Sequence, residues 1–220
     1  MINQIGDYQI KKVSWGYFFV KRCFDIFNSL LALIVLSPLL LLFTILVACT
    51  SRGPVFFKDV RVGKKGKPIK VLKLRSMYAD AEEHPEKYFN PEQLQRWRTE
   101  RKVDKDPRIT PIGRFIRKTS IDELPQLINI LCGSMSIVGP RPITELELKE
   151  HFTQEQRDIL LSTRPGLTGY WQVYGRSESD FASGNRVRQN MLYFEKRSLW
   201  FDLKLIILTV PAVLKHKGAQ

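Results

Sequence analysis

Two neighbouring acids, Asp122 and Glu123, lie in the stretch "TSIDELPQLINI" (119–130), directly after the basic run "GRFIRK". Cations favour the ionised form of a nearby carboxylate, so Arg117 and its basic neighbours predict that Asp122 is charged. An ionised carboxylate can attack phosphorus and form an aspartyl-phosphate. Glu123 could then bind Mg²⁺, which neutralises phosphate charge in such reactions. The pair is therefore a candidate centre for phosphoryl transfer.

The same stretch also has a purely structural interpretation. Ser120 and Glu123 fit the S-x-x-E capping box, in which the serine caps the first helical turn and the glutamate bonds back to the cap's backbone N–H. Apolar residues then recur at helical spacing and predict a buried helix that begins at Ile121; they are Ile121, Leu124, Leu127, Ile128 and Leu131. Spacing alone leaves both interpretations open.

The composition limits the class of partner. The chain has 220 residues, 44% of them hydrophobic, which is enough for one folded domain plus an attachment segment. Its 35 basic and 22 acidic residues give a formal net charge of +13, which favours an anionic partner: nucleic acid, a membrane face or a phosphorylated substrate. The three cysteines lack C-x-x-C spacing, so neither a disulfide framework nor a zinc site is indicated.

A long apolar run lies near the N-terminus. Residues 26–51 carry no charge, and "LLALIVLSPLLLLFTILVAC" is long enough to enter or cross a membrane. A signal peptide is disfavoured because no small-residue cleavage pattern ends the run. The run is basic on both sides, whereas a single crossing should be basic on one. We expect Lys21 and Arg22, just before it, to contact lipid headgroups.

The middle of the apolar run contains Ser37-Pro38. Proline removes a helix hydrogen bond and bends the helix, and a nearby serine can satisfy the freed carbonyl. Two basic ends and a central kink together predict a re-entrant hairpin that enters and leaves by the same face. A kinked spanning helix is the alternative.

The remaining segments predict a small α+β domain. "PVFFKDVRVG" and "KPIKVLKLRSM", joined by a "KKGK" turn, indicate a β-hairpin. The polar stretch 79–105 indicates short exposed helices, followed by a weak D-x-D match, "DKD" (104–106). "IVGPRPIT" (137–144) and "RPGLTGYWQVYGR" (164–176) are punctuated by Pro and Gly and predict fixed loops rather than helices. The tail 198–215 is either core or an amphipathic helix in the membrane interface.

These motifs together resemble a known family. The Ser-Pro run, "KVLKLRSM", "DPRITPIGRFIRKTSIDELPQLINIL", "GSMSIVGPRPI", "RPGLTGYWQVYGR" and "SLWFDLKLIILTV" occur in the order seen in bacterial sugar transferases, the monotopic polyprenyl-phosphate phosphoglycosyl transferases. The resemblance runs from about residue 18 to the C-terminus. It is nearest to the branch that transfers galactose or glucose 1-phosphate to begin O-antigen, capsule or exopolysaccharide synthesis.

The resemblance implies a mostly helical α+β fold in three parts. Residues 1–17 would be an N-terminal extension, 18–51 a re-entrant membrane helix with its kink at Ser37 and Pro38, and 52–220 a compact catalytic domain with interfacial amphipathic helices. The expected location is the bacterial cytoplasmic (inner) membrane, with the catalytic domain on the cytoplasmic face. A homodimer is left open.

The resemblance also implies the reaction and its residues. A UDP-sugar would give its hexose 1-phosphate to Asp122 with release of UMP, and undecaprenyl phosphate would then take the phosphosugar. Glu123 would bind the Mg²⁺ cofactor. Substrate phosphates would be bound by a set of basic residues: Lys73, Arg75, Arg117, Arg141 and Arg176.

Several alternatives remain at this point. The same reaction with an N-acetylated amino sugar is the nearest of them, since no segment of the sequence indicates which sugar is transferred. For Lys73 and Arg75 the alternative role is local pairing, and for Arg141 it is a structural role in its loop. Arg117 and Arg176 could instead be surface or salt-bridge arginines. A membrane-tethered nucleic-acid binder is disfavoured because no interleaved basic and aromatic face is evident, so we expect no nucleic-acid partner. A non-enzymatic membrane scaffold is the last alternative.

Overall fold

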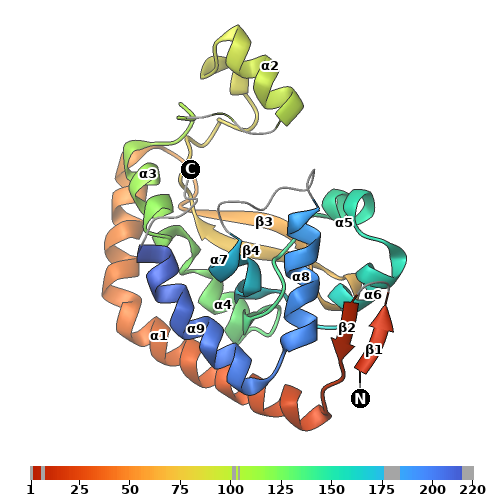
Figure 1. Cartoon of the computed structure of the whole chain (residues 1–220). Coiled ribbons are helices and arrows are strands. Elements are labelled where there is room, and N and C mark those ends of the chain that lie inside the picture. Colours follow the sequence, from red (N-terminus) through yellow and green to blue (C-terminus); the bar gives the residue numbers. More distant parts are fainter. Residues whose placement is uncertain (1, 6–7, 101–102, 104, 176–183, 215–220) are drawn as a thin grey trace. The chain divides into compact units, whose positions relative to one another are not determined.

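The structure, a computed structural model, describes residues 2–5, 8–100, 103, 105–175 and 184–214 (Figure 1). The predicted α+β, mostly helical fold is confirmed. In chain order the elements are β1 (Ile2–Ile5), β2 (Tyr8–Lys11), α1 (Trp15–Thr50), β3 (Phe56–Val62), η1 (Lys64–Gly66), β4 (Pro68–Leu74), η2 (Pro85–Lys87), α2 (Pro91–Glu100), α3 (Pro111–Lys118), η3 (Ile121–Glu123), α4 (Gln126–Leu131), β5 (Ser136–Val138), α5 (Glu145–His151), α6 (Gln154–Leu161), β6 (Gly166–Thr168), α7 (Tyr170–Tyr174), α8 (Asn185–Lys196) and α9 (Leu199–Leu214).

The chain divides into two compact units. Unit 1 comprises Met1–Val35, Lys58–Val71 and Gln126–Gly218, and unit 2 is built on Leu36–Phe57 and Leu72–Pro125. Helix α1 and the hairpin β3–β4 contribute residues to both units.

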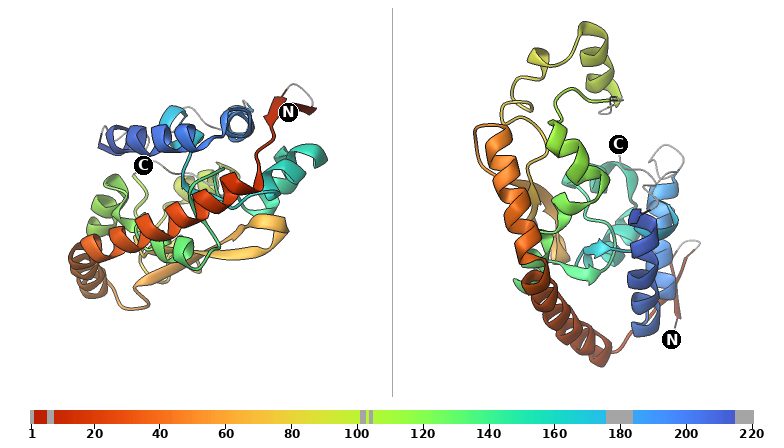
Figure 2. Two further views of the ribbon diagram at one scale, coloured as in Figure 1. Left: turned by 90° about the horizontal axis from the view of Figure 1, so that it is seen from below. Right: turned by 90° about the vertical axis from the view of Figure 1, so that its left-hand side faces the viewer.

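Helix α1 is one unbroken helix in the described chain, and both views of Figure 2 draw it as a continuous ribbon. It contains Pro38, and both Ser37 and Pro38 are exposed. Its most apolar window has a mean hydropathy of 3.0 and is only 11% buried, whereas a core helix of a soluble protein would be mostly buried. Length and composition therefore allow it to cross or enter a membrane.

The predicted β-hairpin is confirmed as β3 and β4, and the predicted short helices in 79–105 are confirmed as η2 and α2. The loop predicted for 164–176 is wrong in part, because it contains β6 and α7. Strand β6 pairs in parallel with β5, in the register Ser136↔Gly166 and Val138↔Thr168. A Cβ on Gly166 would lie 2.1 Å from Gly139 N, so these glycines permit a close backbone approach rather than marking a loop.

Unit 1 has the larger apolar core. Helices α7, α8 and α9 pack together at the C-terminal end of the chain, and β2 lies against α8 (Figure 1). Met191, Phe194 and Leu205 are completely buried there, and Tyr193 is 2% exposed. The inner side of α9 is thus part of this core.

Unit 2 has a smaller core between the second half of α1, β4 and α3. Val47, Leu74 and Ile116 are at most 2% exposed. The rings of Phe43 and Phe115 stack at 5.6 Å between centroids. This packing holds α3, and with it the turn that follows, against the C-terminal half of α1.

Candidate active site

The approach of α3 to the segment after β4 sets the position of Arg117. Thr110 is the N-cap of α3, and its hydroxyl accepts a hydrogen bond from Gly113 N–H at 2.9 Å. A Cβ on Gly113 would lie 1.9 Å from the carbonyl oxygen of Ser76, so only glycine lets the helix come this close. One turn later, Arg117 Nε donates a hydrogen bond to Ser76 Oγ at 2.7 Å.

The chain turns between α3 and α4 through a left-handed residue. Ser120 has φ 57° and ψ 19°, a conformation that residues other than glycine seldom adopt. Asp122 and Glu123 follow in the short turn η3, and α4 begins only at Gln126. The helix predicted from Ile121 is therefore wrong in part, because a short 3-10 helix begins at Ile121 but the α-helix begins only at Gln126.

The capping-box interpretation of Ser120 and Glu123 is also wrong, because the Ser120 side chain makes no capping hydrogen bond. An N-cap residue has an extended backbone, from which its hydroxyl reaches the N–H groups of the next turn. The left-handed backbone of Ser120 does not provide that geometry. A capping box therefore does not explain the two acids.

Asp122 is half-buried, and its surroundings shift its pKa in opposite directions. Burial and the neighbouring Glu123 raise the pKa of Asp122 to about 7, while Lys73 and Arg117 lower it. The cations expected from the sequence are present, but loss of solvent and the second acid outweigh them. Near neutral pH the Asp122 carboxyl group therefore exists in both protonation states.

Lys73 and Arg117 are the two cations that act on Asp122 within unit 2. Lys73 lies near the end of β4, and Arg117 lies in the last turn of α3. Burial lowers the pKa of the Arg117 guanidinium, whereas Asp122 and Asp106 raise it. Arg117 Nε is bonded to Ser76, and the two terminal nitrogens have no hydrogen bond to a described residue. Those nitrogens are available to an anion.

Arg75 pairs locally, which is one of the two roles that the sequence allowed. Its Nη1 donates to Pro54 O at 2.6 Å, and its Nη2 donates to Ser51 O at 2.6 Å. The side chain is 7% exposed and satisfies carbonyls just beyond the end of α1. The geometry gives Arg75 a structural role.

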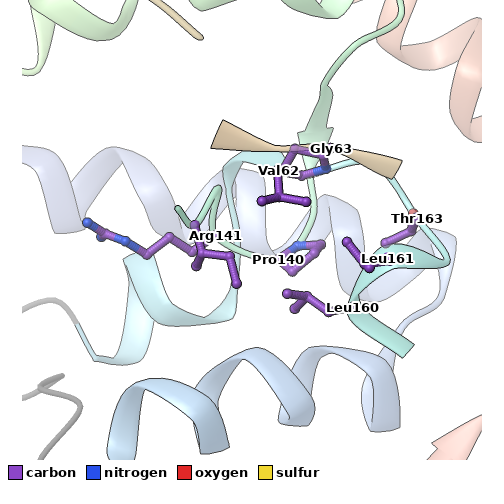
Figure 3. Close-up of a pocket in the computed structure, with 9 residues that line it drawn as sticks. Val62, Gly63, Pro140, Arg141, Leu160, Leu161 and Thr163 are labelled. Carbon is purple, nitrogen blue, oxygen red and sulfur yellow. The ribbon is translucent and has the colours of Figure 1, made fainter. Parts of the chain in front are cut away.

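Arg141 belongs to unit 1. Its guanidinium stacks over the Trp171 ring at 4.0 Å, and its backbone N–H donates to Asn190 Oδ1 at 2.8 Å. Figure 3 shows this guanidinium pointing away from the apolar lining of a pocket of about 10 Å³, room for roughly one water molecule. Arg176, the remaining phosphate-binding candidate, lies outside the described residues.

The two basic residues expected at lipid headgroups have internal partners. Lys21 is 7% exposed, and its Nζ forms an ion pair with Asp202 Oδ2 at 2.8 Å. Arg22 donates from Nη1 to Ile130 O at 2.6 Å and from Nη2 to Leu131 O at 2.8 Å, which caps the last carbonyls of α4. Both side chains thus connect α1 to later parts of unit 1.

The weak D-x-D match has a structural explanation in its described part. Asp106 forms an ion pair with Arg108 at 2.6 Å, and the Arg108 guanidinium lies over the rings of Phe89 and Trp97. Asp104 lies outside the described residues. Sequence reasoning missed this pair and also missed Ser76, because a single serine or a two-residue ion pair carries no spacing signal.

The residues present fit Mg²⁺. Among the described residues no three His, Cys, Asp or Glu side chains converge as a metal site, but Mg²⁺ is commonly held by one or two carboxylates plus substrate phosphates and water. Asp122 and Glu123 are adjacent, and the charge of Glu123 raises the pKa of Asp122. A divalent cation would relieve that repulsion. Glu123, with Asp122 beside it, is the residue that would hold the ion.

One family description, "Bacterial sugar transferase", matches residues 16–216, nearly the whole chain. The chain belongs to this family. Across 201 residues this bacterial sugar transferase is 43% identical to the exopolysaccharide production protein ExoY of Sinorhizobium fredii, a match that covers 90% of this chain and 87% of the relative. Membership makes the protein a transferase enzyme, as the resemblance predicts.

Two further relatives are longer proteins. The sugar transferase is 41% identical over 203 residues to the undecaprenyl-phosphate galactose phosphotransferase of Salmonella typhimurium. It is 40% identical over 205 residues to the UDP-glucose:undecaprenyl-phosphate glucose-1-phosphate transferase of Escherichia coli. Each match covers 91% of this chain but only 42% and 41% of the respective relative.

Proposed function

We propose that this sugar transferase moves a hexose 1-phosphate from a UDP-sugar to undecaprenyl phosphate and releases UMP, as the first membrane step of surface polysaccharide synthesis. The observation that carries the proposal is the half-buried Asp122–Glu123 pair, which follows a left-handed residue and lies under the influence of Lys73 and Arg117. The names of the Salmonella and Escherichia relatives support the lipid carrier, and that of the latter supports the sugar nucleotide.

In the first step, a carboxylate oxygen of Asp122 attacks the β-phosphorus of the UDP-sugar. The new O–P bond forms as the bond from that phosphorus to the bridging oxygen breaks, and UMP leaves with the bonding electron pair. In the second step, an oxygen of undecaprenyl phosphate attacks the same phosphorus and Asp122 is released as a carboxylate. Lys73 and Arg117 stabilise the negative charge on the transferred phosphate. Mg²⁺ would add further neutralising charge on the diphosphate.

The charge-free run 26–51 is proposed to be a re-entrant membrane hairpin. Arg22, before the run, bonds to the carbonyls of Ile130 and Leu131, far after it. Lys64 Nζ, also after the run, lies 5.5 Å from the centroid of the Phe18 ring. Contact between these segments supports an arrangement in which both ends of the run lie on one side of the membrane, and Pro38 supplies a point at which the helix can bend. A helix that crosses once would separate them.

Helix α9 is proposed to lie in the membrane interface. Its inner side is buried at Leu205, whereas Trp200, Ile207 and Val210 on its outer side are 77%, 62% and 59% exposed. Exposed aromatic and aliphatic side chains on one side of a helix are typical of interfacial helices. With both substrates at the cytoplasmic face of the inner membrane, this arrangement would keep the enzyme at headgroup level.

Asp122→Asn tests the proposed function. The variant should keep its fold but lose several orders of magnitude of UMP release, since the nucleophile is gone. Wild-type protein given a UDP-sugar without lipid should gain a hexose-phosphate mass on the peptide that holds Asp122. Asp80→Asn is the matched control, because the Asp80 carboxylate bonds to Tyr88 and Lys87.

Three outcomes would overturn the proposal. Labelling of another residue would remove Asp122 as the nucleophile. Release of UDP instead of UMP would indicate an ordinary glycosyltransferase. Absence of turnover with every UDP-sugar would favour the non-enzymatic membrane scaffold. The same assay with UDP-N-acetyl sugars distinguishes a hexose donor from an amino-sugar donor.

A further inference from the structure

We infer that Ser76 is a positioning residue, whose hydroxyl fixes the Arg117 guanidinium so that its two terminal nitrogens are presented to the phosphate that reacts at Asp122. The hydrogen bond itself is a feature of the fold. Its consequence for the reaction rests on the proposed function.

Several contacts other than the one with Arg117 hold Ser76 in place. The residue as a whole is 8% exposed, and its carbonyl oxygen accepts a hydrogen bond from Thr110 N–H at 3.1 Å. Met77 and Ile109 form an antiparallel bridge next to it. Gly113 lies directly against the same carbonyl oxygen. The first turn of α3 is therefore clamped to the backbone of Ser76.

The second turn of α3 returns to the side chain of the same serine. Thr110, Gly113 and Arg117 are spaced by three and four residues, so they lie on one face of the helix. Arg117 Nε donates to Ser76 Oγ at 2.7 Å. One buried serine thus fixes both the start of α3 and the guanidinium at its end.

The hydrogen bond selects which donors of Arg117 remain available. A guanidinium is a planar fork, so a bond at Nε restrains its orientation and leaves the end formed by the two terminal nitrogens for another partner. Those two nitrogens can bind two phosphate oxygens at once. Helix α3 packs against η3, so the last turn of α3, which carries Arg117, lies next to the turn that carries Asp122.

Loss of the Ser76 hydroxyl should therefore lower kcat. Without Ser76 Oγ the long Arg117 side chain can adopt several rotamers, and the guanidinium spends less time where the transition state needs it. We expect Ser76→Ala to lower kcat by roughly tenfold, the size usual for a hydrogen bond to a charged group, with little change in the KM for the UDP-sugar. Ser76→Thr keeps the hydroxyl and should retain most of kcat.

A double-mutant cycle on full-length protein separates positioning from a merely structural role. If Ser76 acts through Arg117, then Ser76→Ala should have almost no further effect on UMP release once Arg117→Ala is present. Ser162→Ala is the matched control, since within the described part of the chain Ser162 Oγ bonds to the backbone carbonyl of Ile159 in unit 1. It should leave kcat unchanged in both backgrounds.

Additive losses in the cycle, equal losses in Ser76→Thr and Ser76→Ala, or full activity of Ser76→Ala would each overturn the inference. The hydrogen bond has a readout that needs no turnover: exchange of the Arg117 Nε–H with solvent, followed by ¹⁵N NMR, should be slow in the wild type and faster in Ser76→Ala. Fast exchange in the wild type would refute the contact. A wild type without phosphosugar transfer but with slow exchange would instead refute the proposed function.

Discussion

At the scale of single residues, the two acids of η3 have different expected roles. Asp122 is the one whose environment is most altered, by burial and by its neighbour, and it is the residue assigned to covalent chemistry. Glu123 is assigned to the cation. Both assignments replace a capping role that the left-handed Ser120 does not permit.

The role of Glu123 predicts a metal dependence. Chelation with EDTA should stop turnover, and Mg²⁺ should restore it where Zn²⁺ does so poorly, because the oxygen ligands suit a hard ion. Glu123→Gln should need far more Mg²⁺ for half-maximal UMP release. The exposed Glu145, paired only with Lys149, gives the control Glu145→Gln, with an unchanged Mg²⁺ requirement. Full activity of Glu123→Gln in chelator would rule out this role.

At the scale of elements, the contact between α3 and the end of β4 depends on Gly113. The added Cβ of Gly113→Ala would meet Ser76 O, which is backbone and cannot move away easily. Overpacking of this kind costs about 1–3 kcal/mol of unfolding free energy, and it should also separate Arg117 from Ser76 and lower kcat.

Thermal unfolding and UMP release measure both effects of Gly113→Ala. The matched control is Gly16→Ala, whose new Cβ would come no closer than 3.6 Å to Ser14 Oγ and should be neutral or slightly stabilising. Equal behaviour of the two variants would contradict the proposed close approach.

The proposed bend of helix α1 at Ser37–Pro38 predicts a topology. Replacing Ser37 with Leu and Pro38 with Ala should favour a straight crossing helix, because the missing hydrogen bond is restored. In a protein whose free, exposed cysteines Cys23, Cys49 and Cys132 have been changed to serine, Lys12→Cys and Lys67→Cys report the two ends.

An impermeant thiol reagent on intact cells should label neither reporter in the parent. In the Ser37–Pro38 variant it should label Lys12→Cys in a fraction of molecules, with loss of activity. Labelling of Lys12→Cys in the parent would show an ordinary spanning helix and end the hairpin proposal.

At the scale of the whole chain, its beginning and end are joined by a buried polar cluster in unit 1. Asp202 on α9 accepts hydrogen bonds from Lys21 Nζ and Tyr17 Oη on α1, each at 2.8 Å, and from Tyr193 Oη on α8 at 3.2 Å. Charges removed from water must be paired to be tolerated. This cluster therefore fixes the first half of α1 to the C-terminal helices.

Asp202→Asn should lower the free energy of unfolding by about 3–5 kcal/mol, because it leaves the Lys21 ammonium buried without its counter-charge. The double variant Lys21→Met, Asp202→Leu should recover much of this loss. Chemical denaturation in detergent measures both. The exposed Lys149–Glu145 pair is the control, and breaking it should cost no more than about 1 kcal/mol. A loss of similar size at both pairs would contradict the structural role of the cluster.

The sequence by itself determined the features that depend on local pattern. Two segments rich in Val, Ile and Phe, joined by a basic turn, predicted β3 and β4. The charge-free run predicted an apolar helix, and the order of motifs predicted the family. Prediction failed where a pattern fits two structures. "SIDE" fits a capping box but forms none, and "GLTGYWQVY" fits a loop but forms β6 and α7. These failures arise because local spacing cannot report a left-handed residue or a parallel strand pair.

The tertiary structure decided which side chains meet and how much water they lose. The pKa of Asp122 rises chiefly because the fold removes its solvent, although Glu123 and the nearby cations were readable in the sequence. The sequence suggested that three cations bind a phosphate or a membrane, but each bonds to a distant part of the chain. Lys21 pairs with Asp202, Arg22 bonds to Ile130 O, and Arg75 bonds to Pro54 O. Ser76 gains its importance only because α3 folds back onto it. Burial and long-range proximity are properties of the packed chain, and no local window of the sequence contains them.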